Sequence, residues 1–338
     1  MGRLDKLKKI KTLQNYILKE NETNDFISTG CCSLNILFGG GIDKGIPLGK
    51  VSMIAADSSL GKSMIGLRLA RNAQKKGKSV VLFDAEKAYS TSLAENLGID
   101  SNEILVIQNT SLEEVTTQFM NICDEIKNEG NINDYLFIID SWNVLVTSKT
   151  LEDSLSGKDV QDMTQAKKKN TLAKLLLHSN ATIFVINQIY SSMDAYSMDS
   201  IPGGKGIYFA SSSIVQATSK AKDKNSDGEI TGAIITAQTR KGRYSREHSK
   251  LKYLINYDGG INPFFGLLDI ALEGGYIIKP SAGFYQRTCL ENDKKHREKE
   301  IYNLEFWKPL FENTDFKTYV EKEFSFKHNE INDENIDF

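Results

Sequence analysis

Short apolar runs alternate with longer mixed segments along most of the chain. Four runs that are almost continuously apolar predict strands: Val51–Ala55, Val80–Phe83, Tyr135–Ile139 and Thr182–Ile186. The segments between them predict helices: Ser63–Lys76, Leu112–Lys127 and Val160–His178. Continuous apolar strands separated by helices are typical of a mostly parallel sheet that is covered on both faces. We therefore predict an α/β fold with this kind of sheet at its centre.

The second half of the chain changes its pattern twice. Three runs lie closer together and are joined by polar turns: Ile214–Thr218, Gly232–Gln238 and Lys250–Tyr257. They predict antiparallel strands added at the edge of the sheet. After Gly259-Gly260 a compact region follows, in which Phe264–Leu272 and Phe306–Phe311 predict helices and Tyr276–Ile278 is extended. We expect a core over residues 26–260 and a small C-terminal α/β region over residues 261–325.

The two ends of the chain differ from the rest. Within residues 1–25, one helical face collects the apolar residues Leu4, Leu7, Ile10, Leu13, Ile17 and Leu18. A short helix cannot bury such a stripe alone, so this arm packs either on its own domain or on a neighbouring subunit. Residues 326–338 form an acidic tail.

Composition and charge exclude several classes of protein. The 338 residues are 40% hydrophobic and 25% charged, as in ordinary globular proteins. The net charge of −2 does not indicate a polycationic nucleic-acid binder, although a local groove can still bind nucleic acid. No apolar run is long enough for a bilayer span, and the N-terminus is no signal peptide. The four cysteines have neither zinc nor disulfide spacing, which favours a reducing, intracellular compartment.

Residues 56–63, Ala-Asp-Ser-Ser-Leu-Gly-Lys-Ser, follow the first predicted strand and open the next helix. Backbone N–H groups of such a loop converge on phosphate oxygens, and the helix N-terminus favours negative charge. We expect Lys62 to reach the β- and γ-phosphates and the Ser63 hydroxyl to bind Mg²⁺. Ala56 replaces the first Gly of the pattern, which costs about 1 kcal/mol or more only where φ must be positive. Gly-Lys-Ser alone also occurs at ordinary helix N-termini, but the strand–loop–helix context favours a phosphate site.

Acidic or amide residues end three further predicted strands. Asp84-Ala85-Glu86 follow the second strand, Asp140-Ser141 the third and Asn187-Gln188 the fourth. Ligands of open α/β sheets bind at the carboxyl ends of the strands. There Glu86 is placed to orient or deprotonate a water that attacks the γ-phosphate, and Asp140 to hold Mg²⁺ directly or through water. Each acid alone is equally well a solvated strand-end residue, so the prediction depends on their order and distance from Lys62.

Three polar segments are candidates for contacts with DNA or with a second subunit. Tyr190–Gly204 predicts a loop whose aromatic and Met side chains can stack on bases or wedge between them, unless it is an ordinary surface loop. Thr147–Lys158 is a second polar stretch. The basic side chains of Arg240–Arg243 bind a phosphate group, either in the same chain or across a subunit interface. The alternative is that they form an ordinary solvated basic turn.

These segments together resemble the RecA family of recombinases, and in particular its branch from T-even bacteriophages. The resemblance runs from Ile27–Gly30 to Phe306–Phe311. The phosphate loop and the three strand ends have the order and spacing of the family, as do Gly203-Gly204 and Asp258–Pro263. Asp162–Thr164 and Gly266–Asp269 resemble the phage branch specifically.

The resemblance implies a fold and a function. It implies a RecA-like P-loop NTPase core, with an N-terminal helical arm for oligomerisation and a small C-terminal region. It also implies a DNA-dependent ATPase that uses ATP and Mg²⁺ and forms helical filaments, as a homo-oligomer, on single-stranded DNA. Such filaments pair with homologous duplex DNA and exchange strands in recombination, repair and recombination-dependent replication. Loader and single-strand-binding proteins are implied partners, no membrane is, and the expected location is the cytoplasm, that of the host cell for a phage protein.

The resemblance also assigns roles to individual residues. The catalytic residues are Glu86, Lys62 and Gln188, with Glu86 as the catalytic carboxylate and Gln188 as the γ-phosphate sensor. The nucleotide-binding residues are Ala56, Asp57, Ser58, Ser59, Leu60, Gly61, Lys62, Ser63, Met64 and Asp140, of which Ser63 and Asp140 hold the metal. The two DNA-facing loops are Thr147–Lys158 and Tyr190–Gly204, and the DNA-binding residues in or beside them are Lys149, Lys158, Tyr190, Met193, Tyr196, Gly203, Gly204 and Lys205. Lys241 and Arg243 are the basic pair that reaches ATP across the subunit interface, and the N-terminal helix docks on the adjacent subunit.

Two features leave alternatives open. Leu93 stands where many bacterial members have an aromatic residue that stacks on adenine, so stacking is weaker or Tyr89 substitutes for it. A ring-forming RecA-fold helicase motor and a non-enzymatic RecA-like mediator are the rival functions. The N-terminal arm without a large extra domain favours the filament over the ring. Intact Lys62, Glu86 and Asp140 count against the mediator.

Overall fold

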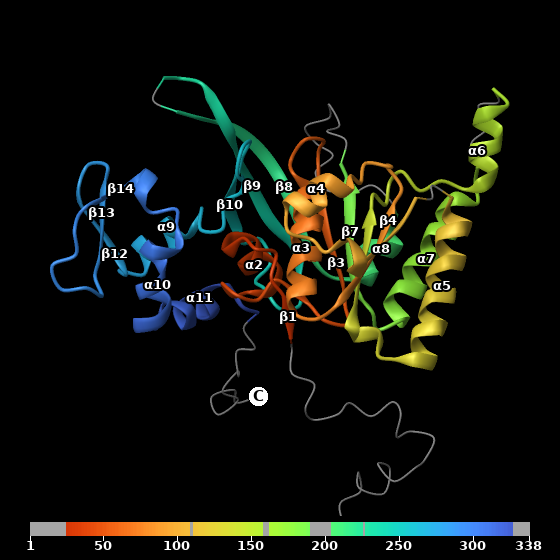
Figure 1. The fold of residues 1–338 in the computed structure, drawn as a ribbon, viewed down its shortest axis with the longest axis horizontal. Helices are drawn as coiled ribbons and strands as arrows, with labels where there is room; N and C mark the ends of the chain where they lie inside the picture. The colour runs from red at the N-terminus through yellow and green to blue at the C-terminus, as the bar shows by residue number, and fades with distance from the viewer. Residues whose placement is uncertain (1–24, 109–110, 158–161, 190–203, 226, 327–338) are drawn as a thin grey trace, which may run out of the picture.

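A nine-stranded sheet forms the centre of the molecule (Figure 1). The computed structural model describes residues 25–108, 111–157, 162–189, 204–225 and 227–326. The strands lie in the order β11-β10-β9-β8-β3-β7-β6-β4-β5. The parallel strands are β3 (Val51–Ala56), β4 (Ser79–Asp84), β5 (Ile104–Ile107), β6 (Tyr135–Asp140), β7 (Thr182–Gln188) and β8 (Ser211–Lys224). The antiparallel strands are β9 (Ile230–Gly242), β10 (Lys250–Asn256) and β11 (Gly260–Ile261). They confirm the predicted antiparallel edge for Gly232–Gln238 and Lys250–Tyr257, whereas Ile214–Thr218 lies in β8, which pairs parallel with β3 and antiparallel with β9.

Helices cover both faces of this sheet. One face packs against α2 (Cys32–Gly39), α3 (Lys62–Lys75) and α4 (Thr91–Asn96), and the other against α5 (Leu112–Glu129), α7 (Gln165–His178) and α8 (Lys205–Ala210). Neighbouring residues of a strand pack on opposite faces of the sheet. In β3, Ile54 packs in the apolar cluster with α2, α3 and α4, and Met53 packs in the cluster with α5, α7 and α8. Because both faces are buried, every residue of β3 is buried, and this explains why the strands read as continuous apolar runs.

The C-terminal region combines a small sheet with three helices. The sheet contains β12 (Ile277–Ser281), β13 (Phe284–Arg287) and β14 (His296–Arg297), and the helices are α9 (Leu267–Glu273), α10 (Leu304–Asn313) and α11 (Phe316–Phe324). Their apolar cluster, centred on Trp307, also includes Ile36 of α2 and Ile42. The Arg246 N–H donates to Phe324 O at 2.7 Å, and the Ser325 hydroxyl donates to Gly40 O at 3.1 Å. The C-terminal region therefore shares its core with the start of the chain.

Smaller elements complete the described residues. They are β1 (Phe26–Ile27), β2 (Ile46–Pro47), α6 (Ser148–Leu155) and the 3₁₀ turns at Ser101–Glu103, Ile132–Asp134 and Glu298–Glu300. The expectation of a loop over Thr147–Lys158 is wrong for most of that segment, because α6 occupies it. Thr147 caps this helix by accepting the Thr150 N–H at 3.1 Å. The expected helix Val160–His178 begins only at Gln165 among the described residues.

Three sequence expectations fall on parts of the chain outside the described residues. They are the N-terminal helix, most of Tyr190–Gly204 and nearly all of the acidic tail. The structure adds helices that the pattern did not predict, namely α2, α4, α6, α8 and α11, and in α2 all residues but the first are buried. A helix that is buried on all sides has no polar stripe, so its sequence lacks the amphipathic period that reveals a helix.

Candidate functional site

The loop between β3 and α3 has the geometry of a phosphate-binding loop. Ala56 is the last residue of β3 and pairs with Gln188 of β7. It is not among the residues with positive φ, so replacing the usual Gly at this position costs no backbone strain. Positive φ occurs instead at Ser59 (60°) and Gly61 (75°). A Cβ at Gly61 would lie 2.3 Å from Cδ1 of Ile255, so the conformation favours glycine there and any larger residue would also displace the end of the Ile255 side chain.

Lys62, the first residue of α3, is held against this loop. Its Nζ donates a hydrogen bond to the backbone oxygen of Asp57 at 2.7 Å, and the residue is only 7% exposed. Burial lowers the pKa of the ammonium, and the carboxylates of Glu86, Asp140 and Asp57 oppose this shift. The side chain is thus already folded over the loop, with three acidic groups near it.

Two adjacent strands bring the predicted acids together. In the pairing of β4 with β6, Asp84 lies opposite Asp140. The N–H groups of Ala85 and Glu86 both donate to Asp140 O, at 2.7 and 3.3 Å. This confirms that the ends of these strands meet at the edge where β3 delivers the phosphate loop.

Asp140 has a buried carboxylate with one free oxygen. It is 7% exposed, and its Oδ1 has no hydrogen-bond partner. Its pKa is raised to about 6, mainly by burial and also by the charges of Glu86 and Asp84, whereas a hydrogen bond with Ser63 and the charge of Lys62 oppose the rise. A buried oxygen without a partner is costly, and a bound cation would supply that partner.

Ser63 and Asp140 fit a magnesium ion that is held together with a nucleotide. Among the described residues, no group of three or more His, Cys, Asp and Glu side chains could hold a metal by itself. Mg²⁺ commonly takes only one or two protein ligands and completes its octahedron with phosphate oxygens and water. The hydrogen-bonded Ser63–Asp140 pair, with its open Oδ1, matches that requirement.

Glu86 is held by two side chains at the edge of the sheet. The Ser141 hydroxyl donates to Glu86 Oε1 at 2.6 Å, and Gln188 Nε2 donates to the same oxygen. Asn143 Nδ2 in turn donates to the backbone oxygen of Gln188 at 2.6 Å. The structure thus brings together Glu86 and Gln188, as the sequence predicted. The contacts of Ser141 and Asn143 were not predicted, and the only sequence signal for them is their position within three residues after Asp140.

The predicted DNA-binding residues are only partly described. Lys149 is exposed on α6, and Lys205 is exposed at the start of α8. Gly204 is the N-cap of α8 and has a φ of 93°. The remaining predicted contacts lie outside the described residues: Lys158, Tyr190, Met193, Tyr196 and Gly203. The DNA-binding assignment therefore stays a prediction.

Lys241 and Arg243 lie far from this chain's own phosphate loop. In the sheet, Val51 at the start of β3 lies opposite Ser211, and Ser213 lies opposite Gly242. The basic pair is therefore at the amino end of β3, whereas the loop leaves its carboxyl end. Lys241 Nζ donates to the backbone oxygens of Tyr208 and Phe209, at 2.9 and 3.1 Å.

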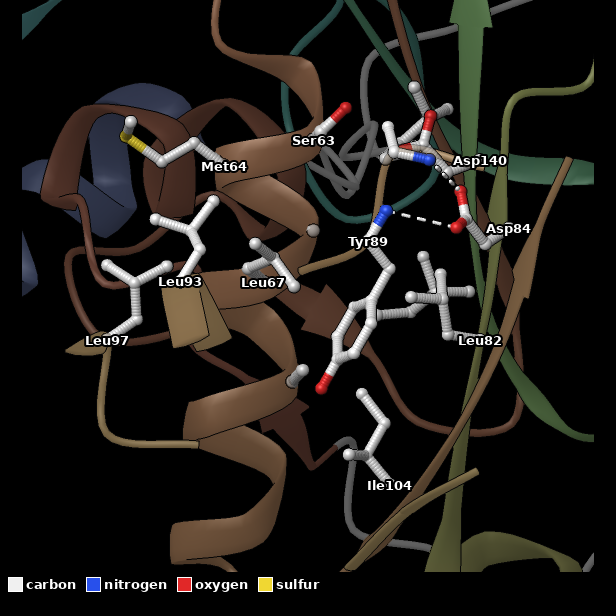
Figure 2. A pocket seen from close by; sticks show the side chains of 15 residues that line it. Ser63, Met64, Leu67, Leu82, Asp84, Tyr89, Leu93, Leu97, Ile104 and Asp140 are labelled. Carbon is white, nitrogen blue, oxygen red and sulfur yellow. Dashed lines mark hydrogen bonds between the residues drawn. The ribbon is translucent and has the colours of Figure 1, made fainter. Parts of the chain in front are cut away.

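An apolar pocket adjoins the phosphate loop. It has a volume of about 220 Å³ and lies between α3, β4 and α4 (Figure 2). Met64 and Leu93 line one side of it, and Leu93 is 47% exposed. The ring of Tyr89 points into the pocket, toward Leu82 and Ile104. Tyr89 is therefore packed against the core instead of presenting its face at the surface.

Comparison with known proteins agrees with this geometry. The model of the RecA N-terminal domain matches residues 8–262. The chain belongs to the RecA family. The model of the C-terminal domain of the bacteriophage T4 recombination and repair protein matches residues 264–320. Both the fold class and the family expected from the sequence are thereby confirmed.

Individual relatives cover most of the chain. The Recombination and repair protein of Enterobacteria phage T4 is 28% identical over 331 residues, 93% of this chain and 83% of the relative. Protein RecA of Clostridium botulinum is 29% identical over 311 residues, 90% and 82% of the two chains. Protein RecA of Chlorobium limicola is 31% identical over 264 residues, 76% and 72%. The recombination and repair function expected from the sequence agrees with these matches. Of the helices that the structure describes, none is both long and apolar enough to cross a membrane.

Proposed function

We propose that this RecA-family chain is an ATP-dependent recombinase that forms filaments on single-stranded DNA and pairs that DNA with homologous duplex. The observation that carries the proposal is the convergence of Lys62, Glu86 and Asp140 at one edge of the sheet, beside a phosphate loop. Relatives named as a recombination and repair protein and as RecA support the same reading.

Each side chain of the site has a separate task in this proposal. The loop amides and the N-terminus of α3 bind the phosphates, and Lys62 exchanges the oxygen of Asp57 for a β- or γ-phosphate oxygen. Ser63 and Asp140 hold Mg²⁺, which neutralises charge on the transferred phosphoryl group. Glu86 orients and deprotonates the attacking water. Gln188, which is bonded to Glu86, exchanges that bond for one to the γ-phosphate and so senses the nucleotide.

Assembly completes the site in this proposal. Because Lys241 and Arg243 lie at the opposite end of the sheet from the loop, they serve the nucleotide of a neighbouring subunit. A head-to-tail contact of this kind, when it does not close, generates an open helical filament. Exchange of identical strands changes the base-pairing energy by roughly zero, so ATP is used to assemble the filament and to release its product. Loader and single-strand-binding proteins are proposed partners.

The rival functions are less well supported. A non-enzymatic mediator has no need of a buried lysine, an open Asp140 oxygen and a hydrogen-bonded Glu86 at one edge. A ring-forming motor would use the same ATP residues, and no described feature favours a ring. Electron micrographs with and without single-stranded DNA distinguish rings from filaments.

Two substitutions test the proposal. Lys62→Ala removes a contact with the nucleotide itself, whereas Glu86→Gln removes only the activation of water. Both should lower DNA-stimulated ATP hydrolysis by orders of magnitude, while Glu86→Gln still binds ATP and DNA. Lys75→Ala, at the exposed last turn of the same helix, is the matched control. An absence of DNA-stimulated hydrolysis in the wild type, or normal turnover in Glu86→Gln, would contradict the proposal.

A further inference from the structure

Asp84 is a buried carboxylate whose two oxygens are both engaged. It ends β4 and is 2% exposed. Its Oδ1 accepts the N–H of Ala88 at 3.0 Å, and its Oδ2 accepts the N–H of Tyr89 at 3.0 Å (Figure 2). Gln108 Nε2, at the end of β5, donates to Oδ2 at 3.1 Å. No role has been assigned to this side chain so far.

These hydrogen bonds hold the turn between Asp84 and Tyr89, which contains Glu86. The Lys87 N–H returns to Asp84 O at 3.3 Å, and Lys87 has a φ of 53°, so the chain turns sharply after Glu86. On the other side, the N–H of Glu86 donates to Asp140 O at 3.3 Å. The backbone of Glu86 is therefore held by β6 on one side and by the Asp84 carboxylate on the other.

The ring of Tyr89 anchors the same segment a second time. It points into the apolar pocket between α3 and β4, where Leu67, Leu82 and Ile104 also line the wall (Figure 2). The polar anchor and the apolar anchor meet in one residue, because the N–H of Tyr89 binds Asp84. The turn that bears Glu86 is thus built as a rigid support.

The three carboxylates of this edge have different surroundings. Asp140 keeps one oxygen without a partner, and Glu86 is exposed and accepts from Ser141 and Gln188. Both oxygens of Asp84 already accept hydrogen bonds from the chain, Oδ1 from one backbone N–H group and Oδ2 from a backbone N–H group and an amide. Its carboxylate therefore stabilises the local fold of the chain, and we assign it no direct contact with the reacting groups.

We propose that Asp84 is a positioning residue that holds the Glu86 carboxylate in line with the attacking water. This inference rests on the proposed catalytic role of Glu86. A displacement of about 1 Å in a catalytic group can lower the rate about 10²-fold, so a support of this kind is a direct determinant of turnover.

Asparagine is the sharpest substitution at this position. It preserves shape and volume but has one acceptor oxygen and one NH₂ group. Whichever way the amide is turned, its NH₂ group faces a backbone N–H, of Ala88 or of Tyr89, and at least one hydrogen bond is lost. Asp84→Asn should therefore loosen the turn while it leaves the phosphate loop intact.

The experiment measures single-turnover and steady-state ATP hydrolysis in a double-mutant cycle. Asp84→Asn should lower kcat about 10- to 100-fold with the KM for ATP unchanged, the size of loss seen when supporting residues around a site are removed. In a Glu86→Gln background the same substitution should cause no further loss, because its effect passes through Glu86. Asp100→Asn, the same change at an exposed turn cap, is the control that leaves the rate unchanged.

Several outcomes would overturn the inference. Equal losses in both backgrounds, or a rise in KM that matches the fall in kcat, would show a general structural role. Normal turnover in Asp84→Asn together with lost turnover in Glu86→Gln removes this inference alone, whereas normal turnover in Glu86→Gln removes the proposed function as well. If Asp84→Asn does not fold, Gln108→Ala takes its place in the experiment. Gln108 is exposed, and its substitution removes one of the three hydrogen-bond donors to Asp84. It should lower kcat by less, again only when Glu86 is present.

Discussion

Replacing Asp140 by Asn should make the nucleotide-free protein more stable while it destroys the proposed magnesium site. Burial, together with the charges of Glu86 and Asp84, raises the pKa of this carboxyl from 3.8 to about 6. At about 1.36 kcal/mol per pKa unit, the ionised carboxylate costs the folded state about 3 kcal/mol. Asn keeps the oxygen that bonds Ser63 but carries no charge, so this cost disappears.

The pH dependence follows from the direction of the shift. A pKa that is higher in the folded state means that the folded protein holds its proton more tightly than the unfolded chain. The penalty is therefore absent below pH 3.8 and fully present above about pH 6. The free energy of unfolding of Asp140→Asn should exceed that of wild type by about 2–3 kcal/mol at neutral pH, and the difference should close as the pH falls through about 6 toward 4.

Urea unfolding with excess EDTA, at several pH values, measures this difference. A second series with Mg²⁺ and ATP at about 1,000 times the Kd should reverse the order, because such a ligand stabilises the protein that binds it by about 4.1 kcal/mol, more than the advantage of Asp140→Asn. Asp100→Asn controls for the loss of a carboxylate that is exposed. The reasoning fails if Asp140→Asn is less stable than wild type at neutral pH in EDTA, or if the difference does not change with pH.

Three further predictions concern separate parts of the molecule. Gly61→Ala should destabilise the fold by about 1–2 kcal/mol through its positive φ alone, and further through the contact with Ile255. It should also weaken nucleotide binding, and an unchanged midpoint of urea unfolding would contradict this prediction. Burial alone would raise the pKa of Asp293, but hydrogen bonds from Arg287 outweigh it and lower the pKa to about 2. Asp293→Asn should therefore cost about 1–2 kcal/mol at neutral pH, after allowance for solvent screening, and the difference from wild type should shrink as the pH falls below 3.8; a constant difference would argue against the pair. Deletion of residues 1–20 should give an ATP-binding core that forms no filaments with single-stranded DNA and a slowly hydrolysed ATP analogue, and normal light scattering would show that the arm packs on its own subunit.

The positions of the main strands and of the phosphate loop could be read directly from the sequence. The apolar runs at residues 51–55 and 135–139 are almost the whole of β3 and β6, because strands buried on both faces are mostly apolar, with Ser52 as the polar exception in β3. The loop before Lys62 was recognisable because a strand, a Gly-containing turn and a helix follow one another without interruption. These are local signals, and they are confined to a few neighbouring residues.

Other features had no such signal. Helix α2 is buried almost throughout and lacks an amphipathic period, and α6 occupies a polar segment that reads as a loop. The C-terminal region follows the core in sequence, yet it packs on Ile36 and Ile42 from the start of the chain. Contacts over such separations depend on the path of the whole chain, which no short window of sequence contains.

By itself, the sequence determined the kind of fold, the phosphate loop and the set of acids at the strand ends, because each of these depends on residue type and spacing along one segment. Only the tertiary structure decided how those acids differ. The pairing of β4 with β6 places Asp84 opposite Asp140, where one oxygen of Asp140 has no partner and both oxygens of Asp84 accept N–H groups of the turn that follows Glu86. The register of β8 and β9 places Lys241 at the far end of the sheet from the loop. Strand register and loop closure are long-range properties, and they convert similar carboxylates and lysines into groups with different tasks.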